Sequence, residues 1–402
     1  MIQSKTIPSA TKKPASSAKV IYLPQQVEAV AQALRVSVLE ACGKFEAATG
    51  KGDKDYLRAL HIQAKLDQGG GTAQTAKALF EKYRSRFRNG SEIDPSKIKP
   101  VLKFVQRNQE WSDLFYATRS MWSMPYNKGY GRRLRFVIFD EYHEAVIGII
   151  GLQSPPADLA ARDRLWDYPD EEKLTLVNCT LDAYAVGAIP PYSYLLGGKL
   201  CAGMISSDTI RQAYWRQYAG RKTRMLDENI QQPLAAVTTT SAFGRSSQYN
   251  RLKYNGRLLA EPIGYTMGFG TIHLEHLYPA LCSYLKMVDG FTDGGFGNGP
   301  KVRWQNICRA LVRLGLPASL LQHGVKREVF LYRLVDQLDD GMAGKGFGAP
   351  ISLPEADFAE FWRERWAVPR AKRFPEWNLG KDVDLLRHTL ASAIAAPLAS
   401  AL

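Results

Sequence analysis

Two apolar segments in the middle of the chain constrain the fold more than any other feature. The segments are "LRFVIFD" (134–140) and "AVIGIIGLQ" (145–153), and four residues, "EYHE", separate them. β-Branched and aromatic residues favour strands, and a connection of this length is typical of a hairpin. The sequence therefore predicts a β-hairpin at this point.

Strand and helix patterns alternate after this hairpin. Short apolar runs bounded by turn residues predict strands, and apolar residues spaced three or four apart predict helices. The predicted order is β-β-α-β-α-β-α-β-β, with one helix over 194–220 and a short one over 246–252. We therefore expect a mixed α/β domain over residues 125–277.

The flanking segments differ in character from this domain. Residues 1–20 are rich in Ser, Lys, Pro and Ala, which predicts a disordered basic tail. Residues 21–124 and 278–402 both show helical spacing, and the second segment ends in a basic, tryptophan-rich stretch. The predicted fold class is α/β (α+β), a mixed-sheet middle domain between helical N- and C-terminal regions.

The charge balance of the chain is strongly basic. Lys and Arg number 53 against 39 Asp and Glu, which gives a formal net charge of +14 and a pI of about 9.4. A surplus of this size favours a polyanionic partner, nucleic acid before a membrane. A surface bias without a partner is the alternative.

The five cysteines show no CxxC spacing. An odd count without that spacing argues for reduced thiols in a cytoplasmic protein, and against a disulfide framework or a zinc ribbon. The first 20 residues lack the apolar core of a signal peptide, and no long apolar window predicts a membrane span. We therefore expect a cytoplasmic protein that does not bind a membrane.

Three basic clusters lie where strands are predicted to end. Arginine forks and serine hydroxyls suit phosphate groups, and an interleaved tyrosine, Tyr249, can stack on a base. We therefore expect contact with nucleic acid, DNA in the first place. The alternative is three independent solvated turns. The expected contact residues are Arg132, Arg133, Arg162, Arg164, Arg245, Ser246, Ser247, Arg251 and Lys253.

The order of elements in the middle domain resembles that of GNAT acyltransferases. In that superfamily a glycine-containing loop opens a helix and receives the pyrophosphate of coenzyme A. Gly197 and Gly198 occupy this place, although no Arg or Gln stands three residues before either of them. Acyl-coenzyme A is expected only under this alternative, and otherwise no cofactor is expected.

The same resemblance suggests an acid and a base. Tyr249 would protonate the departing thiolate, and a base would come from Asp140, Glu141 or Glu144, of which we choose Glu144. The alternative is a helix whose tyrosine packs on the sheet. His273 and His276 flank Glu275 without a third ligand in view, so we expect no metal site.

Several separated motifs resemble one family. They are "GYGRRLRFVIFD", "LDAYAVGAIPPYSYLLGGKLCAGM", "TTTSAFGRSSQYNRLKY", "GFGTIHL" and "HGVKREVFLYRL", in this order. Over residues 120–370 the chain resembles the DruA family of the Druantia anti-phage defence systems. The resemblance implies a role in defence beside a large helicase-like protein, and it assigns no activity to any residue.

Three functions follow from these observations. The first is a defence component that engages nucleic acid through basic loops of the middle domain. The second is an acyl or aminoacyl transferase with a GNAT-like cleft. The third is an assembly subunit that docks on a helicase-like partner. The sequence specifies no oligomeric state.

Overall fold

The computed structural model describes most of the chain. The described residues are 22–67, 70–124, 129–169, 171–223, 227, 229–230, 233–242, 244, 246–293 and 302–395, with side chains described outside 66–72 and 391–395. The predicted basic tail, 1–20, lies outside them. In the described part of the chain, no helix is long and apolar enough to cross a membrane.

The chain forms two compact units. The small unit contains the described residues up to Ala41 together with Leu277–Leu320, and the sheet unit contains Cys42–His276 and Leu321–Leu402. Three helices supply the small unit: the first part of α1 (Pro24–Gly50), α9 (Tyr278–Met287) and α10 (Val302–Arg313). The guanidinium Nε of Arg35 donates to the carbonyl of Leu314 at 2.8 Å, which ties α1 to the end of α10.

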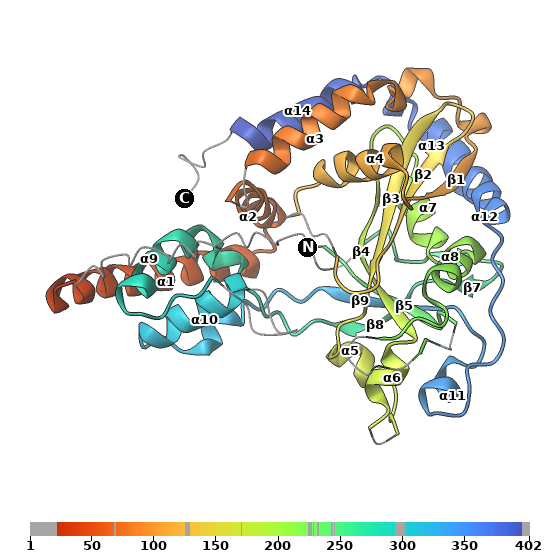
Figure 1. Cartoon of the computed structure of the whole chain (residues 1–402). Coiled ribbons are helices and arrows are strands. Elements are labelled where there is room, and N and C mark those ends of the chain that lie inside the picture. Colours follow the sequence, from red (N-terminus) through yellow and green to blue (C-terminus); the bar gives the residue numbers. More distant parts are fainter. Residues whose placement is uncertain are drawn as a thin grey trace, which may run out of the picture. The chain divides into compact units, whose positions relative to one another are not determined.

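A seven-stranded mixed sheet organises the sheet unit (Figure 1). Its spatial order is β1-β2-β3-β4-β5-β9-β8, and only β4 and β5 are parallel neighbours. The strands are β1 (Pro100–Phe104), β2 (Leu134–Asp140), β3 (Ala145–Gln153), β4 (Thr180–Ala188), β5 (Ala236–Thr240), β8 (Glu261–Tyr265) and β9 (Glu328–Arg333); β6 (Lys253–Tyr254) and β7 (Arg257–Leu258) form a separate hairpin.

Helices cover both faces of this sheet (Figure 1). Alternating side chains sort to the two faces, so Phe136 and Ile138 enter one core cluster and Val137 and Phe139 the other. The first cluster lies under α7 (Gly197–Met204), α8 (Asp208–Tyr218) and α12 (Glu355–Trp362); the second lies under α3 (Gly70–Lys82), α4 (Gln109–Ser120) and α14 (Asp382–Ala395). Both faces of the central strands are therefore buried.

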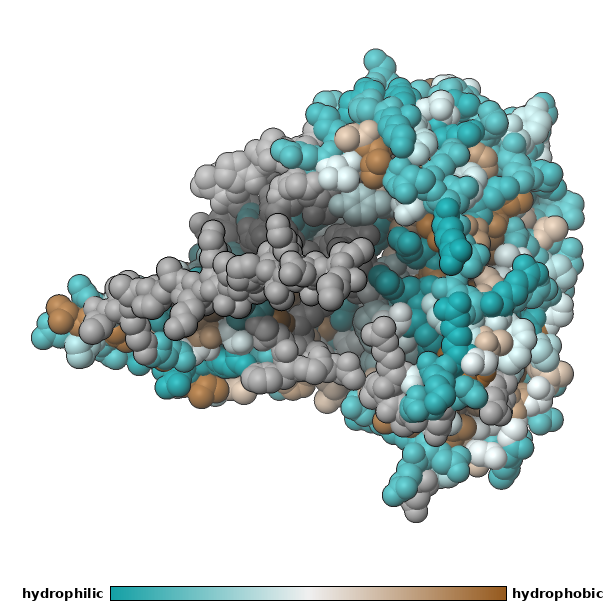
Figure 2. Space-filling view, in the orientation of Figure 1, coloured by the Kyte–Doolittle hydropathy of each residue, from teal (hydrophilic) through white to brown (hydrophobic). Residues whose placement is uncertain are grey.

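Shorter elements complete the sheet unit. A third core cluster, around Trp166, Leu331 and Met342, lies beside β5 and β9. The remaining helices are α2 (Lys54–Asp67), α5 (Ala160–Asp163), α6 (Lys173–Val177), α11 (Leu338–Met342) and α13 (Val368–Arg373). Outside the core, the face drawn in Figure 2 is mainly hydrophilic over this unit, with hydrophobic side chains in small separate groups.

The mixed α/β fold class is confirmed, and so is the predicted hairpin, which is β2, a four-residue turn and β3. The predicted helix over 194–220 is two helices, α7 and α8, because Ser206 and Ser207 interrupt it. Ser207 is the residue before α8, a position that serine favours.

Two strands contradict the predicted helical flanks, and one predicted helix is absent. Residues 100–104 form β1, where Pro100 and the residue before it favour extended backbone. Residues 328–333 form β9, which pairs with β5 and β8. The short helix predicted over 246–252 is wrong, because 247–251 form turns.

Candidate functional site

Arg132, one of the predicted phosphate contacts, is a structural residue in this fold. Its guanidinium donates to the carbonyl of Asn178 at 2.6 Å and to that of Thr180 at 3.4 Å, and it lies over the ring of Tyr214 at 5.6 Å. These contacts hold the loop before β2 against the start of β4 and against α8. The side chain already has its partners within the protein.

Arg162 is also internal. It is fully buried, and it donates to the carboxylate of Asp163 at 2.7 Å and to the carbonyls of Pro156 and Ala157 at 2.9 and 3.0 Å. A guanidinium with this set of partners ties its own loop together and has no face left for a phosphate.

The other predicted contacts lie at the surface, at two places on the sheet unit. Arg133 and Arg164 are exposed near the start of β2 and the end of α5. Segment 246–254 lies near the end of β4, whereas Arg132 binds at the start of that strand. The side-chain amide of Gln248 donates to the carbonyl of Val186 at 3.3 Å. The structure therefore does not bring the three predicted clusters together. Ser247, Arg251 and Lys253 are exposed, Ser246 is partly buried, and Arg245 lies outside the described residues.

Segment 246–254 packs instead against the C-terminal helices. The ammonium of Lys199 on α7 donates to the carbonyl of Asn250 at 2.8 Å and lies over the ring of Trp366 at 5.7 Å. The ring of Tyr254 is 5.1 Å from that of Phe361, which in turn is 5.3 Å from Trp366. These contacts join the segment to α12 and to the π-helical turn Arg363–Ala367 that follows it.

Seven cations belong to α7, to segment 246–254 and to the stretch from Arg363 to Arg373, which these contacts join, and we call them the basic face. Within the described part of the chain, no carboxylate lies within 4.0 Å of any of them. Glu364 is a neighbouring exposed acid. Lys199 and Arg370 are partly buried and the other five are exposed. The basic face consists of Lys199, Arg251, Lys253, Arg365, Arg370, Lys372 and Arg373.

Local geometry holds several of these side chains in place. Arg251 has a positive φ of 56°, which non-glycine residues rarely adopt, directly after the residue whose carbonyl Lys199 binds. Arg370 donates to the carbonyl of Tyr194 at 3.4 Å and lies over the ring of Phe374 at 4.9 Å. Burial lowers the pKa of Lys199.

Gly197 and Gly198 open α7 as predicted, after Leu196 in the left-handed region. The N–H of Gly197 donates to the carbonyl of Tyr192 at 2.9 Å, so it is already bound. A Cβ on Gly198 would lie 3.2 Å from Oε1 of Gln248. The side chain of Gln248 therefore lies beside the helix opening where a pyrophosphate was expected.

Tyr249 and Glu144, the predicted acid and base, lie on opposite faces of the sheet. Tyr249 is buried in the first core cluster, 4.9 Å from the ring of Phe330, and burial raises its pKa to about 12. Glu144 is exposed in the turn after β2, with a φ of 51° and a guanidinium nitrogen of Arg86 at 3.6 Å. The structure does not bring the two groups together.

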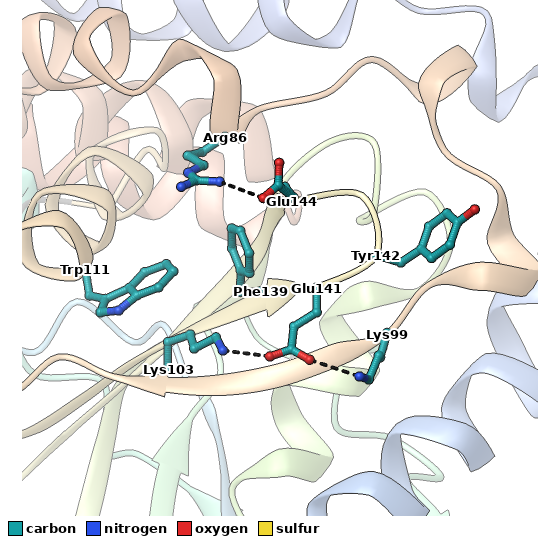
Figure 3. A pocket seen from close by; sticks show the side chains of 8 residues that line it. All are labelled: Arg86, Lys99, Lys103, Trp111, Phe139, Glu141, Tyr142 and Glu144. Carbon is teal, nitrogen blue, oxygen red and sulfur yellow. Dashed lines mark hydrogen bonds and ion pairs between the residues drawn. The ribbon is translucent and has the colours of Figure 1, made fainter.

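A groove of about 540 Å³ lies beside Glu144 (Figure 3). Glu141 accepts ion pairs from Lys99 at 3.1 Å and from Lys103 at 2.8 Å across its floor. The cations of the groove are thus paired with carboxylates, in contrast to those of the basic face. Arg86, Lys99, Lys103, Trp111, Phe139, Glu141, Tyr142 and Glu144 line it.

The turn beside the groove is held in place by Asp140. Its carboxylate accepts from the Nδ1 of His143 at 2.6 Å and from the hydroxyl of Tyr192 at 2.8 Å. Asp140, the first of the three bases considered from the sequence, is therefore a structural residue. The described residues hold no group of three His, Cys, Asp or Glu side chains that could bind a metal.

Sequence reasoning assigned no role to five cations of the basic face: Lys199 on α7, and Arg365, Arg370, Lys372 and Arg373 near the C-terminus. For the last four the signal was present, since they lie beside Trp366 and Phe374 in the basic, tryptophan-rich stretch. The packing of this stretch against segment 246–254 could not be predicted from the sequence.

Comparison with known proteins identifies the family. The family model described as "Druantia protein DruA" matches residues 51–344. The Druantia protein DruA of Escherichia coli (strain UMEA 4076-1) is 37% identical over 337 residues, which cover 83% of this chain and 83% of that protein. No solved structure shows a significant match. The chain belongs to the DruA family, as a component of a Druantia anti-phage system.

Proposed function

We propose that this chain serves Druantia defence by engaging nucleic acid, DNA in the first place, in the cytoplasm. The observation that carries the proposal is the basic face. Its cations lie beside aromatic rings and have no carboxylate partners among the described residues. A set of unpaired cations attracts a phosphate backbone, and neighbouring rings can stack on bases.

The structure changes which residues we propose as contacts. Arg251, Lys253 and Ser247 remain, and the C-terminal cations join them. Arg132 and Arg162 have internal partners, so we propose that they support the fold. Arg133 and Arg164 are exposed outside the basic face, and we propose that they contact only a longer nucleic-acid strand.

A direct test compares charge reversals of equal size. Lys253→Glu lies in the basic face, whereas Lys345→Glu alters an exposed lysine beside α11. Both variants lower the net charge by the same amount. We expect Lys253→Glu, combined with Arg251→Glu, to weaken binding of a short duplex by about tenfold or more at low salt. The control is the double variant Lys345→Glu with Lys54→Glu, which reverses two cations outside the basic face. It should bind the duplex nearly as tightly as the wild type does. Equal losses in both double variants would reduce the effect to net charge and would contradict a defined face.

The strand order of the sheet supports the transferase alternative, but the side chains at the expected coenzyme A site do not. The strand order, with β4 and β5 parallel and paired only over Thr180–Ala183 and Ala236–Thr239, supports a GNAT-like sheet. The side chain of Gln248 lies beside the free part of β4, and Tyr249 is buried in the first core cluster against Phe330. We therefore rank acyl transfer below nucleic-acid binding; calorimetric heat on adding acyl-coenzyme A would reverse that order.

A docking role is favoured by one feature of the small unit. Val36 and Leu39 on α1 and Val312 on α10 are 47%, 52% and 73% exposed. Exposed aliphatic side chains on helices suit a protein partner, and we propose the helicase-like Druantia protein for that place. Copurification of the two proteins, lost on changing Val312 and Leu39 to Ser, would support this; unchanged copurification would contradict it.

A further inference from the structure

Aromatic rings line the groove beside Glu144, which lies outside the basic face (Figure 3). The centre of the Phe139 ring is 5.2 Å from that of Trp111, in an edge-to-face arrangement at 69°. Tyr142 also lines the groove, and it is 55% exposed. The groove therefore offers aromatic surface that solvent reaches.

Ion pairs flank the ring of Phe139 on two sides (Figure 3). On one side the guanidinium of Arg86 lies 3.6 Å from a carboxylate oxygen of Glu144, and it donates to Glu110 at 3.0 Å. On the other side lie the two lysine pairs of Glu141. The groove, counted with Glu110, thus has three cations and three carboxylates. A simple anion or cation would meet as much repulsion as attraction there.

Two polar groups of the groove still have hydrogen-bonding capacity. The carboxylate of Glu144 is 68% exposed, and within the described residues its one ion pair is the 3.6 Å contact with Arg86. The indole N–H of Trp111 donates to no group in the described part of the chain. An acceptor and a donor therefore lie beside the aromatic rings.

A nucleobase matches this combination of groups. It is planar, it carries no net charge, and its edges present both donors and acceptors. Every base also has a face that stacks on an aromatic side chain. The volume of the groove, about 540 Å³, lies within the range of about 300–1,000 Å³ that is usual for small-ligand sites. The groove therefore has the composition and the size of a site for one base.

Segment 95–99 joins the groove to the basic face. Its last residue, Lys99, lines the groove, and the carbonyl of Ile98 accepts from the guanidinium of Arg363 at 3.3 Å. Arg363 begins the π-helical turn, and the first three residues of the segment pack against that turn and against α13. The turn and α13 hold the C-terminal cations of the basic face. Since Lys97 and Lys99 are exposed, cations continue from the basic face to the groove.

We propose that the groove binds one unstacked base of a single-stranded DNA end, with the neighbouring phosphates on the basic face. This inference rests on the proposed function. The base stacks on the aromatic rings, its amino group donates to Glu144, and its edge accepts from the indole N–H of Trp111. The bases of a duplex are paired and stacked, so a single-stranded end presents a base at the lowest cost. An aromatic side chain of a protein partner would use the rings but not the cations of segment 95–99.

Fluorescence anisotropy with three DNA probes and the full chain tests this inference. The probes are a blunt duplex, the same duplex with a short single-stranded overhang, and that duplex with an overhang of abasic sites. The two overhangs carry the same phosphates, so the difference between them reports the bases alone. We expect the overhang with bases to bind tighter than the abasic overhang by about tenfold.

The outcomes separate this inference from the proposed function. Equal affinity for the two overhangs would overturn the inference and leave the proposed function standing, and a groove for a partner's aromatic side chain predicts this result. Absence of binding to all three probes would contradict the proposed function as well.

Variants locate the base in the groove. Trp111→Leu and Tyr142→Leu should each reduce the preference for the overhang with bases to about threefold or less. The matched controls, Trp215→Leu on α8 and Tyr265→Leu on β8, change exposed aromatic residues outside the groove and should keep a preference of about tenfold. If Trp111→Leu fails to fold, Tyr142→Leu decides, because that side chain is mainly exposed. An unchanged preference in the groove variants would overturn the inference.

Discussion

Arg132 and Arg133 are neighbours in the sequence, yet their side chains have different environments. The guanidinium of Arg132 bonds the carbonyls of Asn178 and Thr180, whereas the side chain of Arg133 is exposed. The backbone of Arg133 is held by the hydroxyl of Tyr218, which accepts from its N–H at 2.6 Å. The sequence shows two equivalent arginines, because the partners that distinguish them lie more than 40 residues away.

This pair gives a stability prediction. Arg132→Ala should lower the free energy of unfolding by about 1–3 kcal/mol, because it removes the donor from two partly buried carbonyls. Arg133→Ala should change it by about 0.5 kcal/mol or less, as is usual at exposed positions. Urea unfolding of the two variants measures both values. Equal effects would show that Arg132 does not hold β4 in place.

His61 on α2 gives a prediction on pH. Burial, with the nearby charge of Arg327, lowers its pKa from 6.5 to about 4. The unfolded state then binds the proton more readily, so the contribution of neutral His61 is full above pH 6.5 and is lost as the pH falls toward about 4.

The test is urea unfolding of wild type and His61→Gln across that range. The wild type should lose more stability than the variant between pH 6.5 and pH 4, because only the wild type carries this imidazole. Parallel losses in the two proteins would assign the acid sensitivity to other groups.

At the scale of elements, α7 and α12 pack unusually closely. A Cβ on Gly203 would lie 1.9 Å from a ring carbon of Phe358, so only glycine permits this approach. The contact also positions the aromatic side of the basic face, since Phe358 and Phe361 both contact Tyr254. The geometry of the proposed interface therefore depends on a buried helix contact.

Gly203→Ala should destabilise the protein by about 1–3 kcal/mol through overpacking. Gly43→Ala is the matched control, because nothing lies within 4 Å of its Cβ position on α1. In a helix interior that change should stabilise by about 0.5–1 kcal/mol. Thermal unfolding distinguishes the two; a neutral Gly203→Ala would contradict the close packing.

The elements that the sequence predicted well are those whose signal is local. The hairpin of β2 and β3 has dense β-branched runs joined by a short turn, so a window of residues is enough. β1 is stabilised as an edge strand by pairing with β2, and β9 by insertion between β5 and β8. Pairings over such sequence distances leave little local trace, and segment 100–104 lies between helical patterns.

The candidate site was predictable only in part for the same reason. Arg251 and Lys253 were identified because a basic, tyrosine-bearing turn is visible in the sequence. Phe361, which contacts Tyr254 of the same segment, comes from more than 100 residues later in the chain, and only the fold brings the two rings together. Tyr249 lies in the same turn but points into the core.

At the scale of the whole molecule, the net charge of +14 and the DruA family membership set the context for these sites. Charge alone would produce weak, diffuse attraction to any polyanion. Part of that charge instead gathers in the basic face of the sheet unit.

The salt dependence of DNA binding by the purified protein tests the role of the basic face most directly. If the five exposed cations of the basic face contact phosphates, the slope of log K against log salt concentration should be about −4.5 for a duplex. Arg251→Glu with Lys253→Glu should make that slope shallower by about 2. Absent binding, or binding that does not change with salt, would contradict a DNA-binding role for this face.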